Sequence, residues 1–264
     1  MKIGISNGSV VTLEEKSIKI YPSLSTVFPI ITDRTFLTEL KFNVLNDLPP
    51  LELPIKSSKI ICLAKNYAAH AKEMGVEPKN LPVNPSLFLK PASALIGPNE
   101  NIIIPPQTQQ VHHEVELALI IGKKGKNIPL EESMSHIFGY SILLDITARD
   151  IQSIAKREGR PWFEAKGFDT FSPIGPVIVT SDEISNPQNL DLELKLNGVT
   201  KQRGNTKDMI FKIDQIINYC SSIVTLEPGD IIATGTPDGV GPFKKGDRIV
   251  ATIESIGTLE LGVA

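Results

Sequence analysis

The chain has 264 residues, of which 41% are hydrophobic and 22% are charged, a composition typical of a globular domain. Its formal net charge of −3 gives no electrostatic reason to expect nucleic acid or an anionic membrane as a partner. No apolar run approaches the length of a membrane span, and the first residues lack the apolar core of a signal peptide, so we expect a cytoplasmic protein.

The first 55 residues predict a small N-terminal β domain. Two β-rich runs flank Asn7 and Gly8, a dipeptide typical of a tight hairpin turn. Further short strand-like runs follow, and the segment ends in the turn-rich stretch "NDLPPLELP". We therefore expect one domain over residues 1–55 and a second, larger one over 56–264.

Residues 56–264 contain many short β-branched runs separated by proline, glycine and asparagine. The 20 prolines and 19 glycines of the chain punctuate these runs, as strands joined by turns require. Helical spacing is confined to three segments, 66–75, 147–159 and 206–223. The pattern predicts an α+β, β-rich fold in which single helices decorate a sheet assembly.

The first predicted helix, "NYAAHAKEMG", has Asn66 as a candidate N-cap and Gly75 as a candidate stop. His70 and Glu73 are three residues apart and so share a helix face. A carboxylate that holds an imidazole fixes its tautomer and raises its basicity, which suits activation of a water. On spacing alone, an incidental pair on an exposed helix is the more economical interpretation.

Two acids interrupt the apolar strand-like segment 111–121, "VHHEVELALII". Glu114 and Glu116 fall on one face of such a strand, and Asp145 ends a later apolar run, "YSILLD". Each acid alone could cap a turn or face solvent. A divalent cation is the physical reason for several carboxylates to converge in a dry place, and oxygen donors without cysteine favour Mg²⁺ or Mn²⁺. The preceding His112 and His113 are not assigned to the metal.

The second predicted helix, 147–159, looks amphipathic, with Ile151, Ile154 and Ala155 on one side. After it, Lys166 lies in the segment "RPWFEAKGFDTFSP". A surface lysine over a packed aromatic stem explains that pattern. Alternatively, three carboxylates, one divalent cation and one lysine sum to zero charge, which would favour an anionic substrate or a developing enolate.

The third predicted helix, 206–223, has helical spacing at Ile213, Ile216 and Ile217, and it contains Cys220. Cys220 and Cys62 lie in separate apolar stretches and predict buried thiols rather than a disulfide or a zinc site. The stretch "ATGTPDGVGPFKKGD" then offers backbone N–H groups and a hydroxyl to an anion. It is not a P-loop, because no Gly-Lys-Ser/Thr follows the glycines, and a decorative loop is the alternative.

Together these motifs resemble the fumarylacetoacetate hydrolase family. The resemblance runs from about residue 60 to the end of the chain and covers seven segments in order. It is closest to acylpyruvases, oxaloacetate decarboxylases and 2-hydroxyhepta-2,4-diene-1,7-dioate isomerases. The segments are "KNYAAHAKEMG", "PSLFLKPASALIGPNENIIIP", "HHEVELALIIGK", "GYSILLDITARDIQ", "PWFEAKGFDTFSPIGP", "LNGVTKQRGNTKDMIF" and "LEPGDIIATGTPDGVG".

The resemblance assigns roles to individual residues. It places the Mg²⁺ or Mn²⁺ ligands at Glu114, Glu116 and Asp145, the catalytic groups at His70, Glu73 and Lys166, and the substrate-binding groups at Lys65, Tyr67, Gly235 and Thr236. Lys65 stands where many members have arginine, and lysine loses bidentate recognition of a carboxylate. Arg149 and Asp150 also match the family pattern, and we expect them to fix the turn between strand and helix.

The resemblance implies a mixed β-roll or distorted barrel of the family's C-terminal domain type, a homodimer, and a small-molecule 2-oxo acid as substrate. The function expected first is metal-dependent hydrolysis of a C–C bond in a 2,4-dioxo acid such as an acylpyruvate or fumarylpyruvate, through a metal-stabilised enolate. Isomerisation of the unsaturated 2-hydroxy diacid and decarboxylation of oxaloacetate use the same site and stay open. A metal-free Schiff base on Lys166 and a non-catalytic metal- or carboxylate-binding protein are further alternatives.

Overall fold

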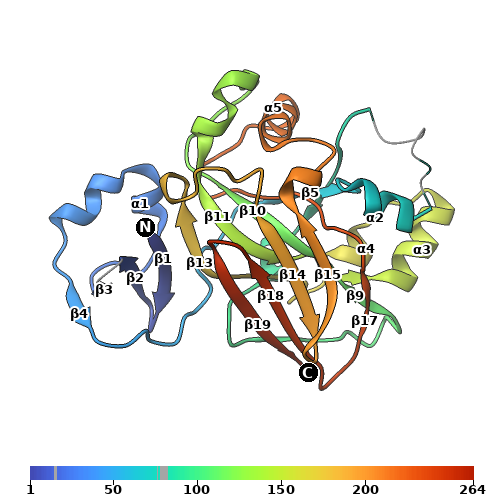
Figure 1. Ribbon diagram of the computed structural model, residues 1–264, viewed down its shortest axis with the longest axis horizontal. Coiled ribbons are helices and arrows are strands. Elements are labelled where there is room, and N and C mark those ends of the chain that lie inside the picture. Colours follow the sequence, from blue (N-terminus) through green and yellow to red (C-terminus); the bar gives the residue numbers. More distant parts are fainter. Residues whose placement is uncertain (15–16, 76, 78–82) are drawn as a thin grey trace.

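The computed structural model describes residues 1–14, 17–75, 77 and 83–264. Strands dominate the architecture, and short helices lie around them (Figure 1). The predicted α+β, strand-rich class is confirmed, and the sheets do not close into a barrel. No helix among the described residues is long and apolar enough to cross a membrane.

The largest sheet has eleven strands within the described residues. Antiparallel pairing of β10 (Val115–Ile121) with β11 (Ile137–Leu144), and of β11 with β13 (Ser172–Thr180), forms its middle. The order is β4-β3-β2-β1-β13-β11-β10-β16-β5-β6, and β7 pairs with β13 off this path. The other strands are β1 (Lys2–Ser6), β2 (Ser9–Glu14), β3 (Ser17–Tyr21), β4 (Asn43–Leu45), β5 (Ile60–Ala64), β6 (Ser86–Lys90), β7 (Leu95–Ile96) and β16 (Ile231–Ala233).

Two smaller sheets complete the strand assembly. The five-stranded sheet has the order β15-β14-β18-β19-β8, and the three-stranded sheet has the order β12-β9-β17. Their strands are β8 (Asn101–Ile102), β9 (Val111–His113), β12 (Thr147–Ala148), β14 (Asp191–Leu196), β15 (Val199–Asn205), β17 (Gly241–Phe243), β18 (Arg248–Ile253) and β19 (Gly257–Val263). The short third sheet matters for function, because β9 leads directly to the first of the predicted metal ligands.

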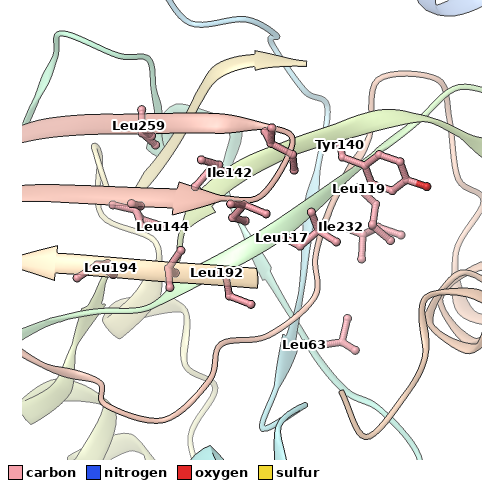
Figure 2. Packing of buried hydrophobic residues seen from close by; sticks show 14 of the residues in the cluster. Leu63, Leu117, Leu119, Tyr140, Ile142, Leu144, Leu192, Leu194, Ile232 and Leu259 are labelled. Carbon is pink, nitrogen blue, oxygen red and sulfur yellow. The ribbon is translucent and has the colours of Figure 1, made fainter. Parts of the chain in front are cut away.

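Strand β10 is buried on both faces. Leu117 and Leu119 point into a core shared with the five-stranded sheet, where Leu192 and Leu259 also lie (Figure 2). On the other face, Ala118 and Ile120 belong to a separate apolar cluster, together with Ala233 of the neighbouring strand β16. Glu116 shares that second face by alternation, so this carboxylate is enclosed by protein.

The N-terminal strands continue the large sheet. The predicted hairpin is confirmed: Ser6 pairs with Ser9, and Asn7 and Gly8 have φ of 47° and 67°. Strand β1 pairs antiparallel with β13, and Ile3 lies in the same apolar cluster as Ile178. The division of the chain at residue 55 stays a prediction.

Three α-helices match the predicted segments. Helix α2 spans Ala68–Glu73, α3 spans Arg149–Glu158 and ends at Gly159 with φ of 66°, and α5 spans Ile213–Ile223. The predicted core positions Ile213, Ile216 and Ile217 of α5 are buried. The other helices are α1 (Phe28–Thr32), α4 (Phe163–Lys166), η1 (Arg34–Glu39), η3 (Ala92–Ala94), η4 (Leu130–His136), η5 (Ser181–Glu183) and η6 (Thr206–Asp208).

Two local predictions about the helices are wrong. Tyr67, not Asn66, is the N-cap of α2, because the Asn66 side chain instead accepts from the Phe211 N–H and donates to the Thr234 carbonyl. On α3, Ile154 is 39% exposed. The buried positions of α3 are Arg149, Gln152 and Ala155, so this helix turns a largely polar face inward. Cys62 and Cys220 are free, buried thiols, as predicted.

Candidate active site

Three carboxylates meet where the large sheet and the three-stranded sheet join. Glu114 lies in a break between β9 and β10, so the predicted continuous strand over 111–121 is interrupted at this residue. Val115 pairs with Leu144, and the Asp145 N–H donates to the Glu114 carbonyl, which sets the two acids side by side. Glu114, Glu116 and Asp145 are buried, and one oxygen of each lies within 4.8 Å of the others.

Three cationic side chains contact two of these carboxylates. Lys166 Nζ donates to Asp145 Oδ2 at 2.5 Å and to Glu114 Oε2 at 3.1 Å. Lys90 Nζ donates to Asp145 Oδ1 at 2.6 Å, and Arg149 forms an ion pair with Glu114. Both lysines are 2% exposed. Three negative and three positive groups therefore balance before any metal is counted.

The charges shift the pKa values in opposite directions. Burial alone would raise the pKa of Glu114, but the charges of Lys166 and Arg149 outweigh it and hold that pKa well below its usual range. Burial would likewise lower the pKa of Lys166, but Asp145 and Glu114 raise it above its ordinary value. Lys166 is thus a protonated ammonium, which is not a nucleophile, and this argues against a Schiff base on it.

Glu116 differs from the other two acids. Burial, and then the charges of Asp145 and Glu114, raise the pKa of Glu116 well above its usual range. Within the described part of the chain no lysine or arginine forms an ion pair with it, and the Gly235 N–H donates to its Oε2 at 2.7 Å. A buried carboxylate that faces two others without a cation of its own fits a site completed by a divalent cation. The donor set, all oxygen, suits Mg²⁺ or Mn²⁺.

His70 and Glu73 form the predicted pair on α2. His70 Nδ1 lies 3.0 Å from Glu73 Oε2, and His70 is 5% exposed, whereas the Glu73 side chain is 32% exposed. Glu73 Oε1 also accepts from the Gly239 N–H at 3.0 Å, which ties α2 to the glycine-rich loop. A carboxylate can only accept, so Nδ1 carries the proton, and in the neutral imidazole Nε2 has the lone pair.

A pocket that is partly open to solvent gathers most of these groups. Its aromatic wall is formed by Phe88 and Trp162, whose ring centroids are 5.7 Å apart. Lys156 Nζ lies 5.3 Å from the centre of the Trp162 ring. The other lining residues are Leu63, Ala64, Lys65, His70, Met74, Glu114, Glu116, Asp145, Arg149, Gln152, Lys166 and Thr236.

The four predicted substrate-binding residues are placed differently from one another. Lys65, with φ of 58°, and Thr236 line the pocket. Tyr67 lies in the apolar core, and its buried hydroxyl has no hydrogen-bond partner among the described residues. The N–H of Gly235 is engaged by Glu116. Lys65 and Thr236 are therefore the better-placed candidates, and all four assignments stay proposals.

The structural role that was expected of Arg149 and Asp150 falls to Asp150. Asp150 accepts from the Gln109 N–H at 2.8 Å and from the Thr108 hydroxyl at 2.5 Å, which fixes the start of α3. Arg149 instead enters the pocket, where it contacts Glu114 and donates to Gln152 Oε1 at 2.7 Å.

Sequence reasoning missed Lys90, Gln152, Lys156 and Gln202. Lys90 ends an apolar strand, a signal of the same kind as the acid at the end of β11. Gln152 and Lys156 lie three and seven residues after Arg149 on α3, so helical spacing links them. Gln202 lies in a polar, mostly exposed strand, and nothing in its neighbourhood distinguishes it.

The chain is similar in sequence and in structure to several named enzymes. The chain is 48% identical over 208 residues to the mitochondrial oxaloacetate tautomerase FAHD1 of Arabidopsis thaliana, covering 79% of this chain and 92% of that one. It matches 5-carboxymethyl-2-hydroxymuconate delta-isomerase of Mycobacterium smegmatis with a TM-score of 0.82 and 36% identity, covering 100% and 98% of the two chains. Fumarylpyruvate hydrolase of Pseudomonas aeruginosa, solved with Mn²⁺ and pyruvate, matches with a TM-score of 0.77 and 34% identity, covering 84% and 99%.

The family model described as fumarylacetoacetate (FAA) hydrolase C-terminal matches residues 59–264, which include every residue of the site. This range also contains the seven sequence segments that carried the resemblance. The chain belongs to the fumarylacetoacetate hydrolase family.

Proposed function

We propose that the protein is a divalent-metal-dependent enzyme that hydrolyses a C–C bond in a 2,4-dioxo acid of the acylpyruvate or fumarylpyruvate type. The observation that carries this proposal is that His70, whose Nδ1 contacts Glu73, lines one pocket together with the three-carboxylate cluster. A hydrolase needs a base for water and a means to stabilise the departing enolate, and the two halves of the pocket offer these.

Glu114, Glu116 and Asp145 would hold the cation, which supplies Lewis-acid polarisation of the substrate's carboxylate and 2-oxo oxygens when bound. His70 takes a proton from water at Nε2, since Nδ1 donates to Glu73. The oxygen of that water bonds to C4 of the substrate, the C3–C4 bond breaks, and its electron pair goes to C3 to form the enolate of pyruvate. The proton on His70 Nε2 then goes to C3, which gives pyruvate and the matching acid. The ammonium of Lys166 offsets the negative charge that develops.

Keto–enol tautomerisation of oxaloacetate is the second candidate, and a specific observation favours it. The Arabidopsis relative named for this activity is 48% identical to this chain. The same Nε2 lone pair of His70 could remove a proton from C3 of a 2-oxo acid without any attack by water. Isomerisation and decarboxylation need the same enolate, and so they share the arrangement.

The test is an assay of the Mn²⁺- or Mg²⁺-loaded protein on acetylpyruvate, fumarylpyruvate and oxaloacetate. The proposal expects pyruvate and the matching acid from the first two substrates, a loss of activity with EDTA, and a fall of about 10²-fold or more in kcat for His70→Asn. Turnover of oxaloacetate alone would favour the second candidate. Full activity in EDTA would overturn the metal-dependent reaction altogether.

A further inference from the structure

Gln202 is an isolated buried amide in an otherwise exposed edge strand. It lies in β15 and is fully buried, whereas Val199 of the same strand is 58% exposed. Its side chain reaches two elements beside the metal ligands: the start of β10 and the loop after β16. No step of the proposed reaction uses this residue.

The orientation of the Gln202 amide follows from two partners that have only one hydrogen-bonding role. The Val115 N–H can only donate, and it lies 3.1 Å from Oε1. The Pro237 carbonyl can only accept, and it lies 3.0 Å from Nε2. The amide is therefore not flipped, and the roles of its other two partners are determined.

Those other partners are His113 and Thr236. His113 Nδ1 lies 3.1 Å from Oε1 of Gln202, so this nitrogen carries the proton and donates. Gln202 Nε2 lies 2.7 Å from Thr236 Oγ1, so the threonine oxygen accepts. The hydrogen bonds thus run in one direction, from His113 through Gln202 to Thr236.

These hydrogen bonds leave the hydroxyl proton of Thr236 available to donate to a ligand. Thr236 lines the pocket and is 2% exposed, and no described residue accepts that proton. The neighbouring Gly235 N–H is already donated to Glu116, so it does not compete with the Thr236 hydroxyl for a ligand in the pocket.

We propose that Gln202 is a positioning residue that fixes the Thr236 hydroxyl as a hydrogen-bond donor to a substrate carboxylate in the pocket. The inference rests on the proposed function insofar as the ligand is a 2-oxo acid. Gln202 touches no substrate itself, and its effect passes through the direction of one hydroxyl proton.

Gln202→Glu tests this direction, because it keeps the shape and replaces the donor by an oxygen that can only accept. The Thr236 hydroxyl would then donate to the new carboxylate and turn its proton away from the ligand. Gln202→Met removes the polar contact but leaves the hydroxyl free to rotate. A purely structural role predicts similar losses for both variants, whereas the proposal predicts a larger loss for the glutamate.

The measurement is the affinity of the Mn²⁺-loaded protein for oxalate, by isothermal titration calorimetry. Thr236→Val and Gln202→Glu are each expected to weaken binding about tenfold or more, as the loss of one hydrogen bond to a charged group does. Gln202→Met should weaken it less, and Thr236→Ser should retain it. With a substrate that turns over, KM should rise by a larger factor than kcat falls.

The double variant of Gln202→Glu with Thr236→Val separates the two explanations. It should bind oxalate as weakly as Thr236→Val alone, because no hydroxyl remains to be redirected. Additive losses, or equal losses for the glutamate and methionine variants, would overturn the proposal. If Gln202→Glu does not fold, the methionine variant is compared in both Thr236 backgrounds, and additive losses there overturn the proposal as well.

The proposed function is tested separately from the role of Gln202, by turnover rather than by oxalate binding. A wild-type protein that binds oxalate but turns over no 2-oxo acid would overturn that function alone, and the oxalate affinities would still decide the role of Gln202. A wild-type protein that does not bind oxalate would overturn both.

Discussion

Asp145 is the residue at which the charges of the site meet. Lys90 and Lys166 each donate to a different oxygen of its carboxylate, and Lys90 also donates to the carbonyls of Ile146 and Phe171. These contacts set the rotamer of Asp145 before any metal arrives. The orientation of a ligand by its other hydrogen bonds commonly matters to metal affinity as much as the ligand itself.

Lys90→Met tests this contribution. It leaves the Asp145 carboxylate with one cation and the Ile146 carbonyl without its donor, and the Phe171 carbonyl keeps only the Ile146 N–H, so the free energy of unfolding is expected to fall by about 3 kcal/mol or more. Mn²⁺ affinity, measured by electron paramagnetic resonance, should fall as well. Lys124→Met, which removes an exposed ion pair with Glu227, is the matched control and should change neither quantity appreciably. An equally small effect of Lys90→Met would contradict the role of this lysine.

The acids of the site could be found from the sequence because each one violates an apolar pattern. Glu116 and Asp145 stand out in or after a run of buried strand residues. Gln202 and Lys156 could not be found in this way, because polar residues in exposed segments are ordinary and only tertiary contacts distinguish them. Of the cations that contact the acids, the sequence indicated Lys166, whereas the contacts of Lys90 and Arg149 depend on the tertiary structure.

At the scale of elements, the break between β9 and β10 is what brings the first ligand to the site. A continuous strand would hold Glu114 and Glu116 on one face by alternation alone. Here β9 pairs with β12 and β17, and β10 pairs with β11 and β16, so the chain passes from one sheet to another at Glu114. The alternation pattern predicted which residues converge, but the sheet change depends on pairings far along the chain.

The N-terminal strands also belong to this scale. We propose residues 1–55 as a small β domain, and the structure attaches it through β1 to β13 and through a shared apolar cluster. A protein that begins at residue 56 would uncover the edge of β13 and part of that cluster. We expect it to unfold at a lower temperature in scanning calorimetry and to aggregate more readily. A truncated protein with unchanged melting temperature would show that the attachment contributes little.

For the whole molecule, the pocket differs in charge from the rest of the chain. The chain carries −3, yet the pocket has four cations, Lys65, Arg149, Lys156 and Lys166, against three acids. A divalent cation would make the pocket more positive, which attracts anions. Neither Lys65 nor Lys156 forms an ion pair with an acid in the described residues. The homodimer and the cytoplasmic location expected from the sequence remain proposals.

Lys156 provides a pH-dependent test of this charge. Partial burial, and then the charges of Arg149 and Lys65, lower the pKa of Lys156 to about 8, so its positive charge is present below that pH and is lost above it. KM for fumarylpyruvate, which carries a second carboxylate, should rise as pH increases through about 8, while KM for acetylpyruvate should change little. Lys156→Met should remove this difference in pH dependence, and Arg157→Met, the adjacent exposed control, should retain it. If KM depended on pH identically for the two substrates in the wild type, an interaction of Lys156 with the second carboxylate of fumarylpyruvate would be contradicted.

The most direct test of the central claim, that three buried carboxylates hold a divalent cation, is thermal unfolding of wild type and Glu116→Gln with Mn²⁺ and with EDTA. The raised pKa of Glu116 means that its ionisation costs stability in the metal-free protein, a cost that appears as pH rises through the pKa of the folded state. In EDTA at neutral pH, Glu116→Gln should therefore unfold at the same or a higher temperature than wild type. Mn²⁺ should raise the melting temperature of wild type and leave that of the variant nearly unchanged. An equal shift of both proteins by Mn²⁺, or no shift of the wild type, would contradict the claim.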